Sequence, residues 1–175
     1  MSMPKRHAKH GSRLASVRRC CTACIMPMLV ACGAPAPPVL PLQPEDFTLR
    51  GVPVDADSAE IRLTFGDPDS IVEGLNPFAD TVPLTTWIYD GFEIRFGGPP
   101  TPVGIMISAP GERTARGATV GDEAAVFRRL YGEPTAILDS NWIYADTTNP
   151  AALHVINAVV HGDTVRRIYM GWALE

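Results

Sequence analysis

The feature that most constrains the fold of this chain is an internal match between two segments 66 residues apart. Residues 51–68 align without a gap on residues 117–134, and both segments end in glycine, an acidic residue and proline. A second match follows in the same order, between the Trp-Ile-Tyr triplets at 87–89 and 142–144. Because two matches in one order are unlike a chance similarity, we predict that the chain contains a duplicated structural unit.

Each matched segment predicts a short amphipathic helix. In the second segment, Phe127 and Tyr131 are four residues apart, as are Val126 and Leu130, so these side chains share one apolar face. Asp122 precedes this stripe and is predicted to be the N-cap, because its carboxylate can accept hydrogen bonds from the first turn. Helices of about ten residues are marginal alone, so both must pack against another element.

The first helix is predicted from the same signals. Ile61 and Phe65 form its apolar stripe, and Asp55 or Asp57 is predicted to cap its N-terminus. The Gly-acid-Pro triplets at 66–68 and 132–134 predict where the two helices end. Glycine can take the left-handed conformation there, and proline cannot continue a helix.

Three strands are predicted to follow each helix. In the first unit they are residues 85–89, 92–96 and 103–107; in the second they are 140–144, 153–160 and 165–170. Within each aromatic triplet, Trp and Tyr are predicted to share the buried side of a strand, because side chains alternate between the two faces. The predicted class is α+β, with two tandem helix–three-strand antiparallel units, residues 47–108 and 109–175, packed as one two-layer body.

This pattern resembles that of known envelope proteins. The residues that carry the resemblance are 120–122, 130–134, their counterparts in the first unit, and the Trp-x-Tyr strands. One such unit is similar to the small lipoproteins of the SmpA/OmlA (BamE-like) family, and two in tandem resemble the β-lactamase-inhibitor-protein-like fold. These residues serve folding, so the resemblance implies a fold, and a role in outer-membrane assembly only by analogy. The chain lacks the family-specific surface loop of the assembly lipoprotein.

The N-terminus predicts export. Residues 1–19 carry six Lys or Arg and no acidic residue, and an apolar run follows at 20–31. This order is typical of a secretory signal, and the run is shorter than the roughly 20 residues that span a bilayer. Residues 29–32, Leu-Val-Ala-Cys, resemble the lipobox of bacterial lipoproteins. The resemblance implies that residues 1–31 are a lipoprotein signal peptide and that Cys32 is acylated as the first residue of the mature chain.

Other interpretations of the leader remain open. The Cys-x-x-Cys at 21–24 could be a redox or metal motif, although it lies inside the apolar run and has no second pair. Arg18-Arg19 could belong to a twin-arginine signal. A plain secretory signal or a retained anchor would also fit, and translation could start at Met1 or Met3.

Beyond the leader, residues 32–46 are predicted to form a proline-rich tether, since five prolines occur in residues 33–44. Residues 32–175 are acidic, with nine arginines against 19 carboxylates, a formal charge of −10. Such a surface does not favour nucleic acid or anionic headgroups as partners, so membrane attachment would depend on acyl chains at Cys32. Gly33 is not the aspartate that retains lipoproteins in the inner membrane, which favours the outer membrane.

No residue pattern predicts a cofactor, a metal or a catalytic group. His154 and His161 lack the spacing of metal ligands and are expected to pack in a strand or face solvent. The acidic pairs at 55–57 and 67–69 could suit calcium or acid–base chemistry, but both lie where aspartate commonly caps helices and forms turns.

Three functional hypotheses follow. The leading one is a lipid-anchored cell-envelope protein that acts without catalysis as a protein-binding or scaffold module, in envelope assembly or maintenance, with an unidentified envelope protein as partner. The alternative is a periplasmic inhibitor or small-ligand-binding lipoprotein, with Arg95, Arg128 and Arg129 as its candidate interaction surface. The third, an envelope hydrolase, would use the carboxylates of Asp67 and Asp69.

Overall fold

The computed structural model describes residues 40–76, 79–97, 102–145 and 154–173. The chain divides into two compact units, residues 1–34 and 35–175, and every described residue belongs to the second. The predicted signal peptide, Cys32 and the tether as far as residue 39 lie outside the described residues. Within the described ranges, no helix has both the length and the apolar character needed to cross a bilayer.

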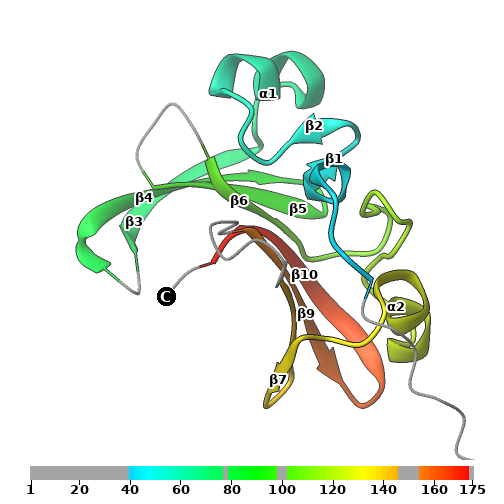
Figure 1. The fold of residues 1–175 in the computed structure, drawn as a ribbon. Helices are drawn as coiled ribbons and strands as arrows, with labels where there is room; N and C mark the ends of the chain where they lie inside the picture. Colours follow the sequence, from blue (N-terminus) through cyan, green and yellow to red (C-terminus); the bar gives the residue numbers. More distant parts are fainter. Residues whose placement is uncertain (1–39, 77–78, 98–101, 146–153, 174–175) are drawn as a thin grey trace, which may run out of the picture. The chain divides into compact units, whose positions relative to one another are not determined.

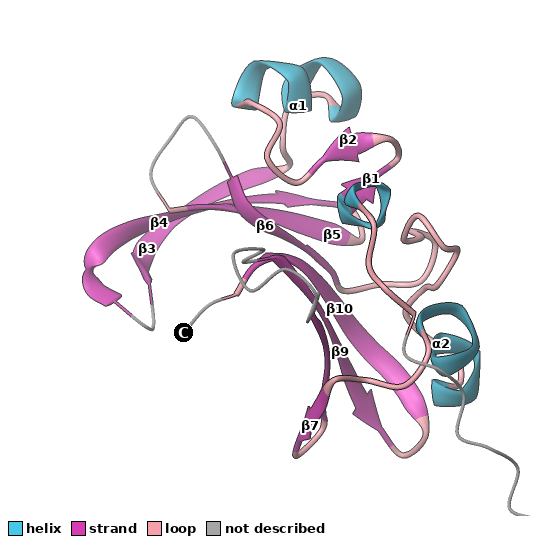
Figure 2. Cartoon of the chain, viewed as in Figure 1, coloured by secondary structure: helices cyan, strands magenta, loops and turns pink. Residues whose placement is uncertain are grey.

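An antiparallel sheet of eight strands dominates the second unit (Figures 1 and 2). Its spatial order is β3-β4-β5-β6-β10-β9-β8-β7, so the first four strands join the last four where β6 pairs with β10. The strands are β3 (Ser70–Asn76), β4 (Ala79–Tyr89), β5 (Phe92–Phe96), β6 (Pro102–Ile107), β7 (Ala136–Leu138), β8 (Asn141–Ala145), β9 (His154–His161) and β10 (Thr164–Trp172).

The described residues contain two α-helices, α1 (Ser58–Phe65) and α2 (Ala124–Tyr131), and each precedes one group of four strands. A 3-10 helix at Pro44–Phe47 leads into a small sheet of β1 (Thr48–Leu49) and β2 (Val52–Pro53). The helices and the small sheet lie on one side of the large sheet (Figure 1). Alternate strand residues face them and form one apolar core, as the buried-intermediate alternation of β5 shows. This leaves the other side of the sheet uncovered by these elements.

The predicted fold class is wrong. The chain does not form two helix–three-strand units, because four strands follow each helix and all eight join in a single sheet. The missed strands, β3 and β7, are the two edges of that sheet. Neither shows the alternation of a half-buried strand, since residues 71–75 and all of β7 are exposed. The other six strands overlap the predicted ranges.

The helix ends agree with the sequence in part. Asp57 is the N-cap of α1, as predicted, and its carboxylate accepts from the backbone N–H of Ala59 and Glu60, both at 2.9 Å. Asp122 is not the N-cap of α2, because its carboxylate turns back to accept from the Thr119 N–H at 2.9 Å. Its own carbonyl accepts from the backbone N–H of Val165 in β10, at 2.9 Å, and the N-cap position falls on Glu123.

Glycine ends both helices, as predicted. Gly66 and Gly132 have φ of +83° and +79°, values that side chains with a Cβ rarely adopt. Their ψ angles of −168° and −161° are extended rather than left-handed helical. The chain therefore turns directly from each helix toward its edge strand.

Candidate binding face

The side of the sheet opposite the helices carries the candidate site, which we call the open face. Strand register places one residue from each of five neighbouring strands in a row across it: Glu93, Met106, Tyr169, Asn157 and Ile143. A hollow of about 430 Å³ lies over this row. Its lining residues are Arg95, Met106, Leu138, Asn141, Ile143, Asn157, Val159 and Tyr169. Both groups of four strands thus contribute to a single concavity.

Tyr169 lies flat on this face because two glycines make room for its ring. A Cβ added to Gly104 would lie 2.5 Å from the Tyr169 ring, and one added to Gly171 would lie 2.4 Å from the Val103 carbonyl oxygen. The Tyr169 hydroxyl lies 3.1 Å from the carbonyl oxygen of Val103 and 2.9 Å from that of Trp172, and can donate to either. Burial raises the pKa of Tyr169 to about 12, against the opposing charge of Arg95, so the phenol is neutral at physiological pH. The Tyr169 ring therefore forms a fixed, apolar floor of the hollow.

The polar groups at this site are few. Arg95 forms an ion pair with Glu93, its neighbour on the same face of β5, and the two side chains are 29% and 25% exposed. Among the described residues, the buried Oδ1 of Asn157 has no hydrogen-bond partner. Buried acceptors are normally paired, so this oxygen is a position where a bound group could donate.

The predicted arginines do not converge on one site. Arg95 lines the hollow on the open face, whereas Arg128 and Arg129 lie on α2, across the sheet. With Ala125 and Asp163 they line a separate depression of about 370 Å³. Arg128 is occupied structurally, since its guanidinium lies 4.3 Å from the Trp142 ring centroid. The candidate interaction surface is therefore divided between two faces.

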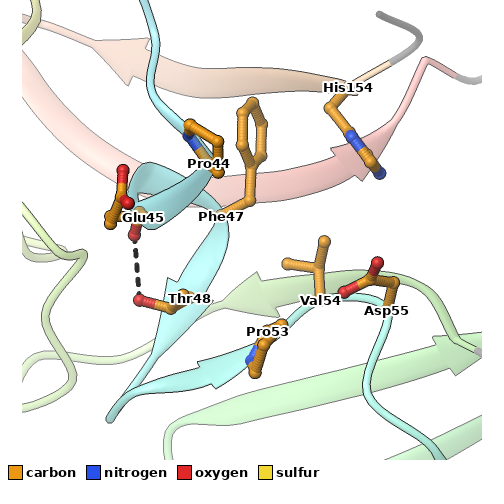
Figure 3. Close-up of a pocket in the computed structure, with 8 residues that line it drawn as sticks. All are labelled: Pro44, Glu45, Phe47, Thr48, Pro53, Val54, Asp55 and His154. Atoms are coloured by element: carbon orange, nitrogen blue, oxygen red, sulfur yellow. Dashed lines mark hydrogen bonds between the residues drawn. The ribbon is translucent and has the colours of Figure 1, made fainter.

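A third hollow, also of about 370 Å³, lies beside the N-terminal segment (Figure 3). Figure 3 shows Phe47 between Pro44 and His154, with Val54 and Asp55 on the segment that leaves β2. The His154 ring centroid lies 5.1 Å from that of Phe47 and 4.7 Å from that of Trp172. His154 thus packs between aromatic rings from two parts of the chain, as a strand histidine was expected to do.

Most of the other candidate polar residues lie apart from one another. His161 is exposed at the β9–β10 turn, while Asp57 caps α1 and Asp67 is ion-paired with Arg62. Asp67 and Asp69 both line a small hollow of about 210 Å³ near the start of β3, so the structure does bring this pair together. In the part of the chain that the structure describes, no group of three or more His, Cys, Asp or Glu side chains is placed to hold a metal ion.

Sequence reasoning missed Tyr169, Met106, Asn141 and Asn157, because their convergence depends on register between distant strands. Two glycines inside strands, Gly104 in β6 and Gly171 in β10, were the available signal. Glycine within a strand often marks the close approach of another group.

Comparison with known proteins gives a loose likeness of fold. No family model matches the chain, and no curated protein matches it. A DUF4309 family protein (YjgB) from Bacillus subtilis subsp. subtilis str. 168 is 13% identical, over 67% of this chain and 78% of that chain, with a TM-score of 0.46. A protein described as a "putative beta-lactamase inhibitor protein" from Streptococcus mutans is 14% identical, over 69% and 84%, with a TM-score of 0.28. The description of the second protein agrees with the β-lactamase-inhibitor-protein-like fold that two tandem units resemble. At these TM-scores, neither likeness bears on function.

Proposed function

We propose that this chain is a non-catalytic protein-binding module of the bacterial cell envelope that holds its partner on the open face. The observation that supports this is the hollow of about 430 Å³, which both groups of strands build on the face that the described helices leave uncovered. A module of this kind can serve as a scaffold in envelope assembly or maintenance. It can equally act as an inhibitor, by covering a partner's protruding loop.

The chemistry of the hollow suits a protein loop. Met, Tyr and Arg are enriched in interface cores, and Met106, Tyr169 and Arg95 meet here. A partner side chain that is apolar at its tip would fill the space above Tyr169. A neighbouring N–H or O–H of the partner would satisfy Asn157 Oδ1, whose present isolation is unfavourable.

The face can be tested with two exposed lining residues. We expect Leu138→Asp with Asn141→Arg to abolish cross-linking of the full chain to its partner in envelope extracts, because both changes put charge at an apolar rim. Leu63→Asp is the matched control, since Leu63 is 88% exposed on α1, on the other side of the sheet. If the open-face variant captures the same proteins as the control, the open face is not the binding surface.

Lipid attachment at Cys32 is part of the same proposal. The leader pattern, the lipobox-like residues 29–32 and the acidic remainder of the chain support an acyl anchor, with the periplasmic face of the outer membrane favoured by Gly33. Mass spectrometry of the native N-terminus should find diacylglycerol on Cys32 and no residues 1–31. Cys32→Ala should move the protein out of the membrane fraction. A retained leader or an unmodified thiol would refute the proposed anchor. Neither result would affect the proposal that the open face binds a partner.

Binding of a small ligand is a second candidate, because the hollow is within the roughly 300–1,000 Å³ typical of ligand pockets. Native mass spectrometry of protein purified from its own envelope separates the two proposals. A ligand that co-purifies with the wild type and is lost from Val159→Trp, which would fill the hollow, supports this candidate. Protein without such a ligand supports the first.

A further inference from the structure

The edge strand β3 is a second surface, separate from the open-face hollow. Its seven residues pair with β4, with a register shift only at its end between Leu75 and Asn76, and among the described residues no strand pairs with its outer side. An unpaired edge offers a row of backbone N–H and C=O groups to another strand. Seven residues are long enough for such pairing, because most strands have about five or six.

The side chains of β3 make this edge apolar. Ile71, Val72 and Leu75 are 48%, 51% and 63% exposed, although each is a large hydrophobic residue. Natural edge strands are usually blunted by shortness, by lysine or by proline. β3 has neither lysine nor proline.

The opposite edge of the sheet shows the contrast. β7 has three residues, and Asp139, which follows it, has a φ of +53° and turns the chain away at once. Its exposed Ile137 and Leu138 thus lie on an edge too short to template another strand. The two edges of one sheet differ in protection, and β3 is the unprotected one.

The charge around β3 indicates what would bind there. Residues 66–76 include Asp67, Asp69 and Glu73 and no basic residue. Arg62, which lies near, is already paired with Asp67. A second copy of this acidic chain would bring like charges together, whereas a basic strand would be attracted.

We propose that β3 accepts an additional β-strand from a partner segment that alternates apolar and basic residues. Backbone hydrogen bonds to the edge would supply affinity, and the apolar side chains would cover Val72 on one face of the sheet. The basic side chains would lie on the other face, which Ile71, Glu73 and Leu75 share, with their stems along the two apolar residues and their charges near Glu73 and Asp69. These charges would select against acidic or neutral strands.

The test uses the full mature chain and a defined probe, a nine-residue peptide of alternating valine and lysine with blocked ends. We expect fluorescence anisotropy to show binding that weakens with salt and at least tenfold when Val72→Lys is introduced. The matched control Leu63→Lys, the same kind of change on exposed α1, should bind as the wild type does. Two further peptides carry N-methyl groups on one or the other alternate set of amides, and one of them should lose at least tenfold in affinity.

Several outcomes would overturn the proposal. They are no binding of the peptide, equal binding by Val72→Lys, equal binding of both methylated peptides, and equal binding of a valine–glutamate peptide. Dimers of the wild type in sedimentation equilibrium that Val72→Lys dissolves would show instead that a second copy occupies the edge. The Leu138→Asp, Asn141→Arg variant should bind the peptide normally, so failure here is distinguishable from failure of the open-face proposal.

Discussion

The two halves of the described chain, α1 with β3–β6 and α2 with β7–β10, place the same elements in the same order but hold their helices differently. α1 has a side-chain N-cap from Asp57, and Ile61 is its buried residue. α2, as far as the described residues show, has no side-chain cap, but it buries Ala124, Phe127 and Tyr131. An eight-residue helix can thus be stabilised at its N-terminal end or through a buried face. α1 is the helix held by its end, and α2 is the helix held by its face.

Both halves share a contact between an arginine of the helix and a tryptophan of the sheet. The Arg62 guanidinium lies 4.5 Å from the Trp87 ring centroid, and that of Arg128 lies 4.3 Å from the centroid of Trp142. Each arginine also pairs with the acidic residue of the following Gly-acid-Pro triplet. We call this arrangement the Arg–Trp clamp. It involves residues of both sequence matches in each half, whereas the helix caps and the buried helix residues differ between the halves.

The largest expected effect is on the helix held by its face. Phe127→Ala should destabilise the protein by about 3–5 kcal/mol, because Phe127 is fully buried and its ring stacks 4.8 Å from that of Tyr131. Ile61→Ala in α1 should cost less, at about 2–3 kcal/mol. Urea denaturation of both variants measures the difference. A cost for Ile61→Ala equal to that of Phe127→Ala would show that α1 is held by its face as well.

Alkaline pH should expose the same asymmetry. Burial raises the pKa of Tyr131 to about 12 from an ordinary value of 10.0, so above pH 10 the unfolded state loses this proton first. The stabilisation is complete below pH 10 and falls as pH rises to about 12, by roughly 3 kcal/mol. Denaturation midpoints between pH 9 and 12 measure the fall. Tyr131→Phe should reduce the dependence of stability on pH more than Tyr89→Phe does in the first half. Equal slopes of stability against pH for the two variants would contradict this prediction.

How far the sequence predicted the fold depends on where the signals lay. Local signals worked: the Asp57 cap, the two helix-ending glycines and the period of two in residues 92–96 all agree with the structure. β3 and β7 were missed because exposed edge strands lack a buried face and therefore lack a period. The number of strands per helix, and with it the fold class, was wrong for this reason.

The candidate site was less predictable, because it depends on strand pairing over long separations. Tyr169 meets Met106 across the β6–β10 junction, and neither residue carries a local mark of a binding face. The predicted arginines illustrate the limit. Arg95 lies in the hollow, but Arg128 serves the Arg–Trp clamp, and composition alone could not separate the two roles.

The Arg–Trp clamp predicts a smaller and symmetrical effect. Arg62→Ala and Arg128→Ala should each cost about 1 kcal/mol, since exposed cation–π contacts contribute about 0.5–1 kcal/mol and the partly exposed ion pairs add little. Thermal unfolding of the two variants, of Trp87→Leu and Trp142→Leu, and of the Arg–Trp double variant in each half would measure the coupling in each half. Loss in one half at least twice that in the other would mean that the two clamps are not equivalent.

The smallest effect concerns the helix held by its end. Asp57→Ala removes both hydrogen bonds to the first turn of α1 and should cost about 1 kcal/mol, the usual value of an N-cap. Glu123→Ala, at the matching position before α2, should change stability by less than about 0.5 kcal/mol, because within the described residues its side chain caps nothing. Urea denaturation at neutral pH resolves the two, and Asp57→Asn should restore most of the loss, since asparagine is an equally good N-cap. If Glu123→Ala were as costly as Asp57→Ala, both helices would depend on their caps, and the contrast between an end-held and a face-held helix would fail.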